Sequence, residues 1–154
     1  MISKAELLQG RDKTFKDEYT QQISDNLDDL LVVLNKLRAA YNKPMTVTSG
    51  WRPASINGMI NGAAPKSNHI TGNACDFADK DGSLFNWCLA NLQLLKDLGL
   101  YLEDPKWTKN WLHVQNTKPS SGKIIYTPSS ALPTNPTAWS GIYDSRFDSK
   151  PIKK

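Results

Sequence analysis

The chain contains only two histidines, and each lies near residues that could complete a metal site. His69 is followed by Asp76 seven residues later, and His113 lies in an alternating apolar and polar segment. A catalytic zinc ion takes three protein ligands from such side chains and keeps a fourth position open for water. His69, Asp76 and His113 would supply that set. The alternative is a hydrogen-bonded core histidine beside a surface aspartate, a common use of these residue types.

Strand alternation predicts which of these side chains share a face. Around His113, the apolar side chains of Leu112 and Val114 would point to the opposite face, toward a core. In the same way, Asp76 would point away from its neighbour Cys75. The pattern therefore favours Asp76 over Cys75 as a ligand, and predicts that Cys75 is a buried thiol.

Three short motifs, in this order along the chain, are similar to those of a known group of zinc peptidases. Residues 49–53 are Ser-Gly-Trp-Arg-Pro, residues 67–76 follow Ser-x-His-x-x-Gly-x-Ala-x-Asp, and residues 111–114 follow Trp-x-His-Val. They resemble the M15 group, which includes D-Ala-D-Ala carboxypeptidases and L-alanyl-D-glutamate endopeptidases. That group shares its zinc fold with hedgehog and lysostaphin-type domains. The resemblance covers about residues 24–115.

The resemblance implies a site and a reaction. The zinc ligands would be His69, Asp76 and His113, and the substrate-binding residues would be Arg52, Ser67 and Asn57. The reaction would be peptide hydrolysis, in which zinc lowers the pKa of a water molecule and polarises the scissile carbonyl. The guanidinium of Arg52 would suit the oxyanion of a tetrahedral intermediate or a substrate carboxylate. A surface salt bridge is the alternative role for this arginine.

One position departs from the pattern of many M15 relatives. They have an acidic residue three positions before the second histidine, where this chain has Asn110. An amide cannot accept a proton from water, so the general base must lie elsewhere. The nearest carboxylates are Glu103 and Asp104. An antiparallel hairpin that packs Leu102 into the core would bring Glu103 to the side of His113 and turn Asp104 away. Glu103 is therefore the predicted base.

The elements that must position these residues are typical of an α+β domain. Apolar spacing predicts helices over residues 23–41, 53–60 and 83–98, with Ser24 as the N-cap of the first. Alternating patterns predict strands at residues 45–49, 74–79, 100–103, 111–115 and 123–127. We therefore expect a small antiparallel sheet with helices packed on one face and a zinc site on the other.

Length and charge limit the other possibilities. A chain of 154 residues fits one domain, which we place at residues 1–127, followed by a basic tail rich in Pro, Ser and Thr at residues 128–154. Up to Thr117 there are 13 basic and 13 acidic side chains, so the net charge of +4 arises entirely in the remainder. A nucleic-acid-binding protein would spread its positive charge over a face, and no nucleic-acid partner is expected. Cys75 and Cys88 are too few for a disulfide framework, and both are expected to be buried thiols.

The predicted function is that of a zinc metallopeptidase that hydrolyses peptidoglycan stem peptides, as the endolysins of bacteriophages do. We expect a monomer without a transmembrane segment or signal peptide, which accumulates in the cytoplasm and reaches the cell wall through a membrane lesion. The alternative is a catalytically inactive module that binds zinc and serves a structural or wall-recognition role. The asparagine at position 110 would permit that alternative.

Overall fold

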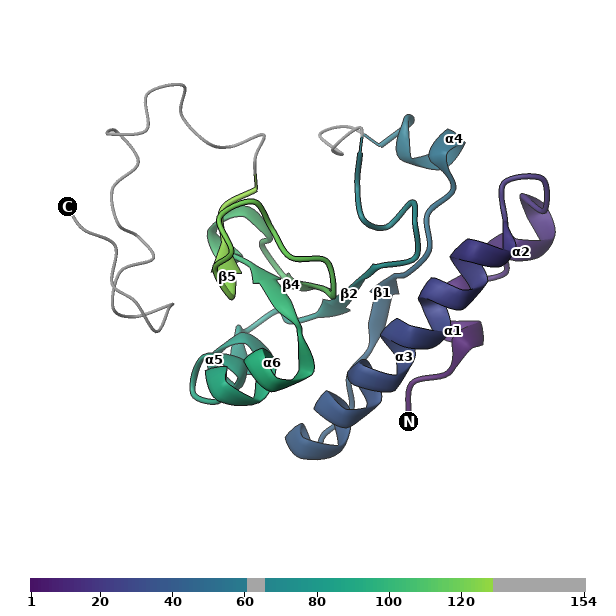
Figure 1. Ribbon diagram of the computed structural model, residues 1–154. Helices are drawn as coiled ribbons and strands as arrows, with labels where there is room; N and C mark the ends of the chain where they lie inside the picture. Colours follow the sequence, from purple (N-terminus) through teal and green to yellow (C-terminus); the bar gives the residue numbers. More distant parts are fainter. Residues whose placement is uncertain (61–65, 129–154) are drawn as a thin grey trace, which may run out of the picture.

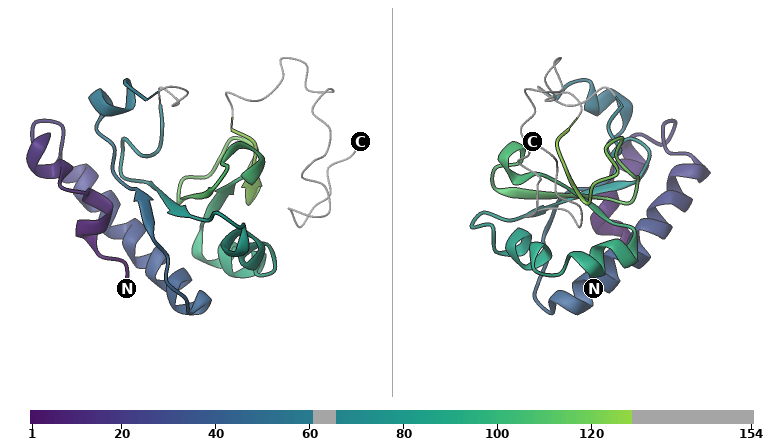
Figure 2. Two further views of the ribbon diagram at one scale, coloured as in Figure 1. Left: turned by 180° about the vertical axis from the view of Figure 1, so that it is seen from behind. Right: turned by 60° about the vertical axis from the view of Figure 1, so that its left-hand side comes forward.

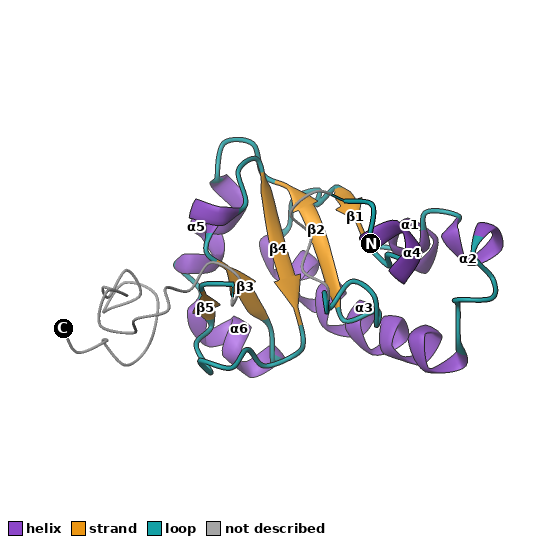
Figure 3. Cartoon of the chain, turned by 90° about the horizontal axis from the view of Figure 1, so that it is seen from above, coloured by secondary structure: helices purple, strands orange, loops and turns teal. Residues whose placement is uncertain are grey.

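The computed structural model describes residues 1–60 and 66–128, and its centre is a five-stranded sheet (Figure 1). The strands are β1 (Val47–Ser49), β2 (Ala74–Ala78), β3 (Tyr101–Glu103), β4 (Trp111–Gln115) and β5 (Ile125–Tyr126). Their order across the sheet is β1-β2-β4-β3-β5, as Figure 3 shows from above. Beyond Pro128, the expected basic tail lies outside the described residues.

The sheet is antiparallel except at one edge. β2 pairs antiparallel with both β1 and β4, and β3 pairs antiparallel with β4. β5 pairs parallel with β3, with Leu102 opposite Ile125. These pairings confirm the predicted α+β class and the predicted β3–β4 hairpin. β5 is the one exception within the predicted antiparallel sheet, because the chain crosses to the outer side of β3 before it pairs.

Six α-helices and one 3-10 helix surround the sheet in the described residues. They are α1 (Lys4–Leu8), α2 (Arg11–Thr14), α3 (Gln21–Tyr41), α4 (Ala54–Asn57), α5 (Ser83–Leu89), α6 (Leu92–Leu98) and η1 (Pro105–Trp107). In Figures 1 and 2, α3, α5 and α6 lie on one side of the strands, whereas α4 lies on the other. None of these helices is long and apolar enough to cross a membrane.

The N-terminus of α3 differs from the sequence prediction. Thr20, not Ser24, is the N-cap, and its hydroxyl accepts a hydrogen bond from the backbone N–H of Ile23. Ser24 lies inside the first turn, where its hydroxyl accepts a 2.7 Å hydrogen bond from Lys4 Nζ. The helix therefore begins earlier than the apolar spacing alone indicated.

The expected single helix over residues 83–98 is two helices. α5 ends at Leu89 and α6 begins at Leu92. Between them, the side-chain amide of Asn91 donates a 2.8 Å hydrogen bond to the carbonyl of Trp87. An asparagine that bonds to nearby backbone groups competes with the helical hydrogen bonds and favours a break. The apolar stripe continues across the break, so periodicity did not reveal it.

The core lies between the sheet and the helices α3, α5 and α6. The fully buried side chains on the helix-facing side of the central strands are Cys75, Phe77, Leu102, Leu112 and Val114. They pack with α3, whose fully buried leucines are Leu27, Leu30, Leu34 and Leu37. Burying one such leucine contributes roughly 1.5–3 kcal/mol. Both cysteines are free and buried, as predicted.

Candidate active site

Asp76 and His113 are direct cross-strand partners on the two neighbouring strands β2 and β4. Side chains directly opposite each other in an antiparallel pair lie on the same face. The flanking pairs, Cys75 with Val114 and Phe77 with Leu112, enter the core on the other face. The register therefore places a carboxylate and an imidazole side by side on the face away from the core.

His69 reaches this face from the segment that precedes β2. Only 3% of His69 is exposed, and its backbone carbonyl accepts a 3.0 Å hydrogen bond from the N–H of Arg52. The indole N–H of Trp51 donates to the carbonyl of Ile70 at 2.9 Å. Gly72 adopts a φ of +81°, a left-handed conformation that turns the chain toward β2. The motif at residues 49–53 and the motif at residues 67–76 are thus joined by hydrogen bonds.

The Gly50-Trp51 pair fixes this arrangement to the N-terminal helix α1. The N–H of Trp51 donates a 2.7 Å hydrogen bond to the carbonyl of Leu7, and a Cβ at Gly50 would collide with that same carbonyl. The indole of Trp51 is fully buried and packs against Tyr19, with ring centroids 5.2 Å apart. The sequence analysis did not predict α1, so this attachment was not foreseen.

The three predicted ligands meet at one carboxylate oxygen. His69 Nε2 lies 3.2 Å from Asp76 Oδ1, and His113 Nδ1 lies 2.9 Å from the same oxygen. One ligand atom from each residue lies within 4.8 Å of the others. Ligand atoms about 2.0–2.1 Å from a tetrahedral zinc ion are separated by roughly 3.3 Å, so this cluster has a suitable size for such an ion.

The hydrogen bond at Nδ1 of His69 determines which ring nitrogen carries the proton. His69 Nδ1 lies 2.8 Å from the carbonyl oxygen of Gly50, which can only accept a hydrogen bond. The Nδ1 atom of His69 therefore carries the proton, and in the neutral ring Nε2 presents a lone pair to Asp76. A lone pair and a carboxylate oxygen at this distance need a cation between them, either a proton or a metal ion.

Electrostatics within the cluster keep its carboxylate ionised. Burial alone would raise the pKa of Asp76, but the charges and hydrogen bonds of His69 and His113 outweigh it and hold the pKa well below its usual value. Burial lowers the pKa of His69, with Asp76 only partly opposing this effect. For His113, burial would lower the pKa, but the hydrogen bond and charge of Asp76 raise it. A metal ion needs a deprotonated carboxylate and neutral imidazoles as ligands.

Arg52 lies next to the cluster and is not part of an exposed salt bridge. Its side chain is 12% exposed, and its Nη2 atom lies 3.8 Å from Asp76 Oδ2. The guanidinium donates hydrogen bonds to Asn57 Oδ1 at 3.1 Å and Ser49 Oγ at 3.3 Å. Its buried Nε makes no hydrogen bond within the described residues. Two protein acceptors therefore fix the orientation of the guanidinium, and its buried Nε–H has no partner within the described residues.

The remaining predicted substrate contacts differ in their surroundings. Asn57 is 4% exposed, so it supports Arg52 from within the fold. Ser67 is half-buried, and its hydroxyl accepts a 3.2 Å hydrogen bond from the N–H of His69. The hydroxyl proton of Ser67 is still available to donate.

The two candidate bases lie in different environments. In the register that pairs Tyr101 with Gln115 and Leu102 with Val114, Glu103 is the next residue and the last of β3. Burial raises the pKa of Glu103, and the positive charge of His113 partly opposes this effect. Asp104 instead caps η1, where its Oδ1 accepts a 2.8 Å hydrogen bond from the N–H of Lys106.

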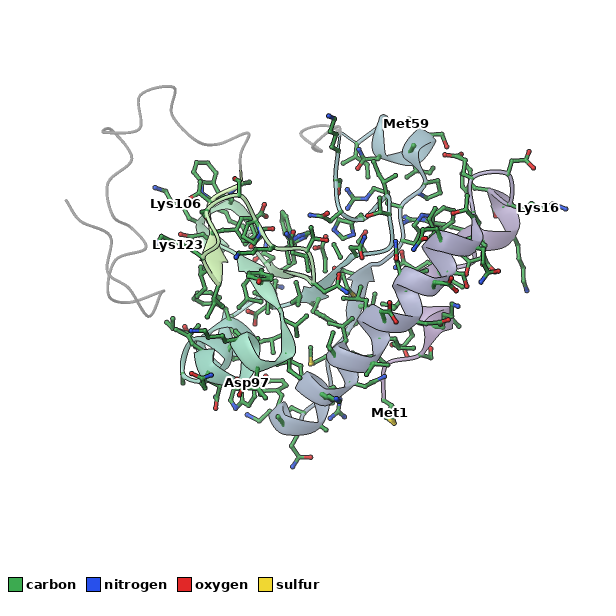
Figure 4. The ribbon with its side chains drawn as sticks, viewed as in Figure 1. Met1, Lys16, Met59, Asp97, Lys106 and Lys123 are labelled. Atoms are coloured by element: carbon green, nitrogen blue, oxygen red, sulfur yellow. The ribbon has the colours of Figure 1, made fainter. Side chains whose placement is uncertain are left out.

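Asn110 has a structural explanation in the turn before β4. Its φ is +75°, in the left-handed region where asparagine is tolerated better than most residues. Its backbone carbonyl accepts a 2.9 Å hydrogen bond from the N–H of Asp79. Figure 4 shows Met59, which follows α4, at the upper right of the molecule and Lys106, on η1, at the upper left.

Three further residues at the site were not predicted. Gln115 Oε1 lies 2.8 Å from His113 Nε2 and accepts hydrogen bonds from the Tyr126 hydroxyl at 2.6 Å and from Asn68 Nδ2 at 3.1 Å. For Gln115, strand alternation predicts the same face as His113, and this was the one feature of the sequence that could have indicated its place at the site. Tyr126 and Asn68 come from β5 and the His69 segment, so no local pattern could have connected them.

Comparison with known proteins shows the family of this chain. The family model Peptidase M15 matches residues 4–115, which is well over half of the chain. No curated protein and no solved structure matches the chain significantly. The match includes all three candidate metal ligands, Arg52 and Glu103. The chain therefore belongs to the M15 family of peptidases.

Proposed function

We propose that this protein is a zinc-dependent peptidase that hydrolyses the stem peptides of bacterial peptidoglycan. The observation that carries the proposal is the convergence of His69, Asp76 and His113 in an M15 chain, with their ligand atoms within 4.8 Å of one another. The family supplies the peptidase class. The positions of the side chains support the roles proposed below for the three metal ligands, Glu103 and Arg52.

The donor set fits zinc. Two imidazole nitrogens and one carboxylate oxygen are the ligands of many catalytic zinc sites. When bound, zinc supplies a Lewis acid that polarises the scissile carbonyl and makes water acidic near neutral pH. His69 is already oriented for this role, since the carbonyl of Gly50 holds the proton on its far nitrogen, 2.8 Å away.

Glu103 is the proposed general base. Leu102 enters the core opposite Val114, so strand alternation directs the carboxylate of the next residue, Glu103, to the ligand-bearing face. In the described part of the chain no hydrogen bond or ion pair engages this carboxylate. There it would accept the proton of the attacking water and pass it to the leaving amine. A general base contributes about 10² to 10⁴ in rate. Asp104 is already used as the cap of η1.

Arg52 is proposed to act on the substrate as an anion-binding group. Its guanidinium remains charged, and Asn57 and Ser49 hold its orientation. The unused Nε donor and the fixed positive charge suit either a developing oxyanion or a carboxylate of the stem peptide. Ser67 would add a hydroxyl donor beside His69.

The peptidoglycan substrate is proposed from the motifs that resemble D-Ala-D-Ala carboxypeptidases and L-alanyl-D-glutamate endopeptidases. Stem peptides carry free carboxylates, which suit the cation of Arg52. On this proposal the protein acts at the cell wall, as a lytic enzyme of the kind that bacteriophages use.

A second candidate is a metal-binding module without catalysis, and Asn110 is the observation in its favour. The position lacks the acidic residue that many relatives have there. The turn at Asn110 explains this residue by its backbone, and Glu103 offers a carboxylate from the neighbouring strand. These two observations favour the enzyme.

The test is digestion of purified cell walls. Wall from several bacterial types is incubated with the zinc-loaded protein, with the chelator-treated protein and with His113→Ala, and released fragments are identified by mass spectrometry. We expect fragments only with the zinc-loaded protein, and restored release when zinc is returned. A single released amino acid would indicate a carboxypeptidase, and a peptide freed from the glycan would indicate an endopeptidase. Zinc binding without release from any wall would favour the inactive module.

A further inference from the structure

The side-chain amide of Gln115 is the centre of a buried hydrogen-bond network beside the candidate metal ligands. Gln115 is 3% exposed, and its oxygen contacts three side chains from separate parts of the fold. These are the Tyr126 hydroxyl at 2.6 Å, His113 Nε2 at 2.8 Å and Asn68 Nδ2 at 3.1 Å. Neither the fold nor the proposed reaction so far accounts for this convergence.

One backbone contact determines how the amide is oriented. Gln115 Nε2 donates a 2.7 Å hydrogen bond to the carbonyl oxygen of Thr117, which has no proton to give. If the amide were flipped, two oxygens would face each other at Thr117, and two NH₂ groups would face each other at Asn68. The oxygen of Gln115 must therefore face His113.

This orientation determines the proton on His113. An amide oxygen only accepts hydrogen bonds, so His113 Nε2 must be the donor. In the neutral ring, the other nitrogen, Nδ1, then presents its lone pair to the ligand cluster, 2.9 Å from Asp76 Oδ1. Tyr126 supports the same oxygen, since burial raises the pKa of its hydroxyl and keeps it a donor.

We propose that Gln115 is a positioning residue that holds His113 in its Nε2–H form and so makes Nδ1 the atom that binds the metal. The inference rests on the metal centre of the proposed function, but not on its hydrolytic step. The competing form of the ring carries its proton on Nδ1 and can donate it to Asp76. That proton would occupy the position where the metal ion must bind.

The network also connects the two histidine segments. Asn68 is the chain neighbour of His69, and its hydrogen bond to Gln115 ties that segment to β4. The rings of His69 and His113 lie with centroids 5.1 Å apart and planes at 66°. Gln115 therefore sets both the protonated nitrogen of one ligand and its position relative to the other.

The first test compares two replacements of Gln115. Gln115→Met fills a similar volume without an acceptor, whereas Gln115→Glu keeps an acceptor oxygen for His113. Gln93→Met makes the same change on the exposed surface of α6 and is the matched control. Zinc affinity is measured by competition with a chromophoric chelator, and circular dichroism checks each fold. We expect Gln115→Met to bind zinc about 10- to 100-fold more weakly and Gln93→Met to stay within a few-fold of the parent protein. Gln115→Glu should lie between them, because it keeps an acceptor for His113 but places a second oxygen against the carbonyl of Thr117.

The second test needs no variant. In the zinc-loaded parent protein labelled with nitrogen-15, the imidazole resonances report which nitrogen of His113 carries a proton. We expect the proton on Nε2 and the metal on Nδ1. A proton on Nδ1, or unchanged zinc affinity in Gln115→Met, would overturn the inference while leaving the metal centre intact. A parent protein that binds no zinc would overturn the proposed metal centre, and this inference with it.

Discussion

The indole N–H of Trp51 donates a 2.9 Å hydrogen bond to the carbonyl oxygen of Ile70. The next residue of each segment repeats the connection in the opposite order, because the N–H of Arg52 donates to the carbonyl of His69 at 3.0 Å. The segment that carries the arginine and the segment that carries the first histidine therefore form one unit. A change in either is expected to disturb both the candidate ligand and the candidate anion-binding group.

Trp51→Phe tests this connection. Phenylalanine keeps an aromatic ring against Tyr19 but leaves the carbonyl of Ile70 without its donor. We expect the free energy of unfolding to fall by about 1–3 kcal/mol, measured by urea denaturation, with weaker zinc binding. Trp107→Phe, at an exposed position, should leave both unchanged. Equal stability in Trp51→Phe and the parent protein would show that the indole hydrogen bond is unimportant.

Replacement of either histidine should remove the metal. Elemental analysis of the parent protein should find about one zinc per chain, because one ligand atom from each of three residues converges within 4.8 Å. His69→Ala and His113→Ala should lose that zinc together with hydrolysis, and Asp97→Ala on the exposed face of α6 should keep both. A histidine variant with full zinc and full hydrolysis would contradict the proposed site.

Glu103→Gln should separate chemistry from metal binding. Glutamine keeps the shape of the side chain but cannot accept the proton, so zinc content should be normal and hydrolysis at least about 100-fold slower. Asparagine caps a helix about as well as aspartate, so Asp104→Asn should change both the melting temperature and the rate little. Near-normal turnover in Glu103→Gln, with an inactive but zinc-loaded Asp104→Asn, would transfer the role of base to Asp104.

Arg52→Lys tests the geometry of the anion-binding group. Lysine keeps the positive charge but cannot reproduce the two bonds to Asn57 and Ser49. We expect kcat/KM to fall by about 10², with zinc content unchanged. Arg38→Lys, on α3, is the matched control. Full activity in Arg52→Lys would mean that charge alone suffices.

The cysteines should resist modification in the folded protein. Burial raises the pKa of Cys88 to about 12, and burial also raises the pKa of Cys75 well above its usual value. A higher pKa reduces the fraction of reactive thiolate at pH 8, so labelling with Ellman's reagent should be slow. Unfolding in denaturant should release two fast-reacting thiols per chain. Rapid labelling of the folded protein would contradict the buried placement.

The sequence predicted the parts of the site that depend on residue type and strand alternation. The central strands β2 and β4 and the facing of Asp76 and His113 followed from a period of two. The β3–β4 pairing, with Leu102 opposite Val114 in the core, also followed the predicted hairpin. Each of these features depends on neighbours only a few residues apart or on one simple pairing.

The features that sequence analysis missed depend on contacts between distant segments. The parallel pairing of β5 leaves no mark in its composition, because a strand has the same alternation in either direction. The break at Asn91 depends on one side-chain hydrogen bond within an uninterrupted apolar stripe. The network around Gln115 joins residues 11 and 47 positions away in sequence. Such distances are set by the fold as a whole.

The unequal anchoring of the three candidate ligands has a consequence for how the site opens. Asp76 and His113 lie on β2 and β4, each flanked by a strand on both sides, so their separation requires a large cooperative opening of the sheet. His69 lies in a loop outside the strand ladder, where its anchors are hydrogen bonds to Gly50 and Arg52, so its separation requires this loop to open but not the sheet. Among the three candidate ligands, amide hydrogen exchange should therefore be fastest at His69. A bound ion would be released stepwise, with this histidine leaving first and the strand pair last.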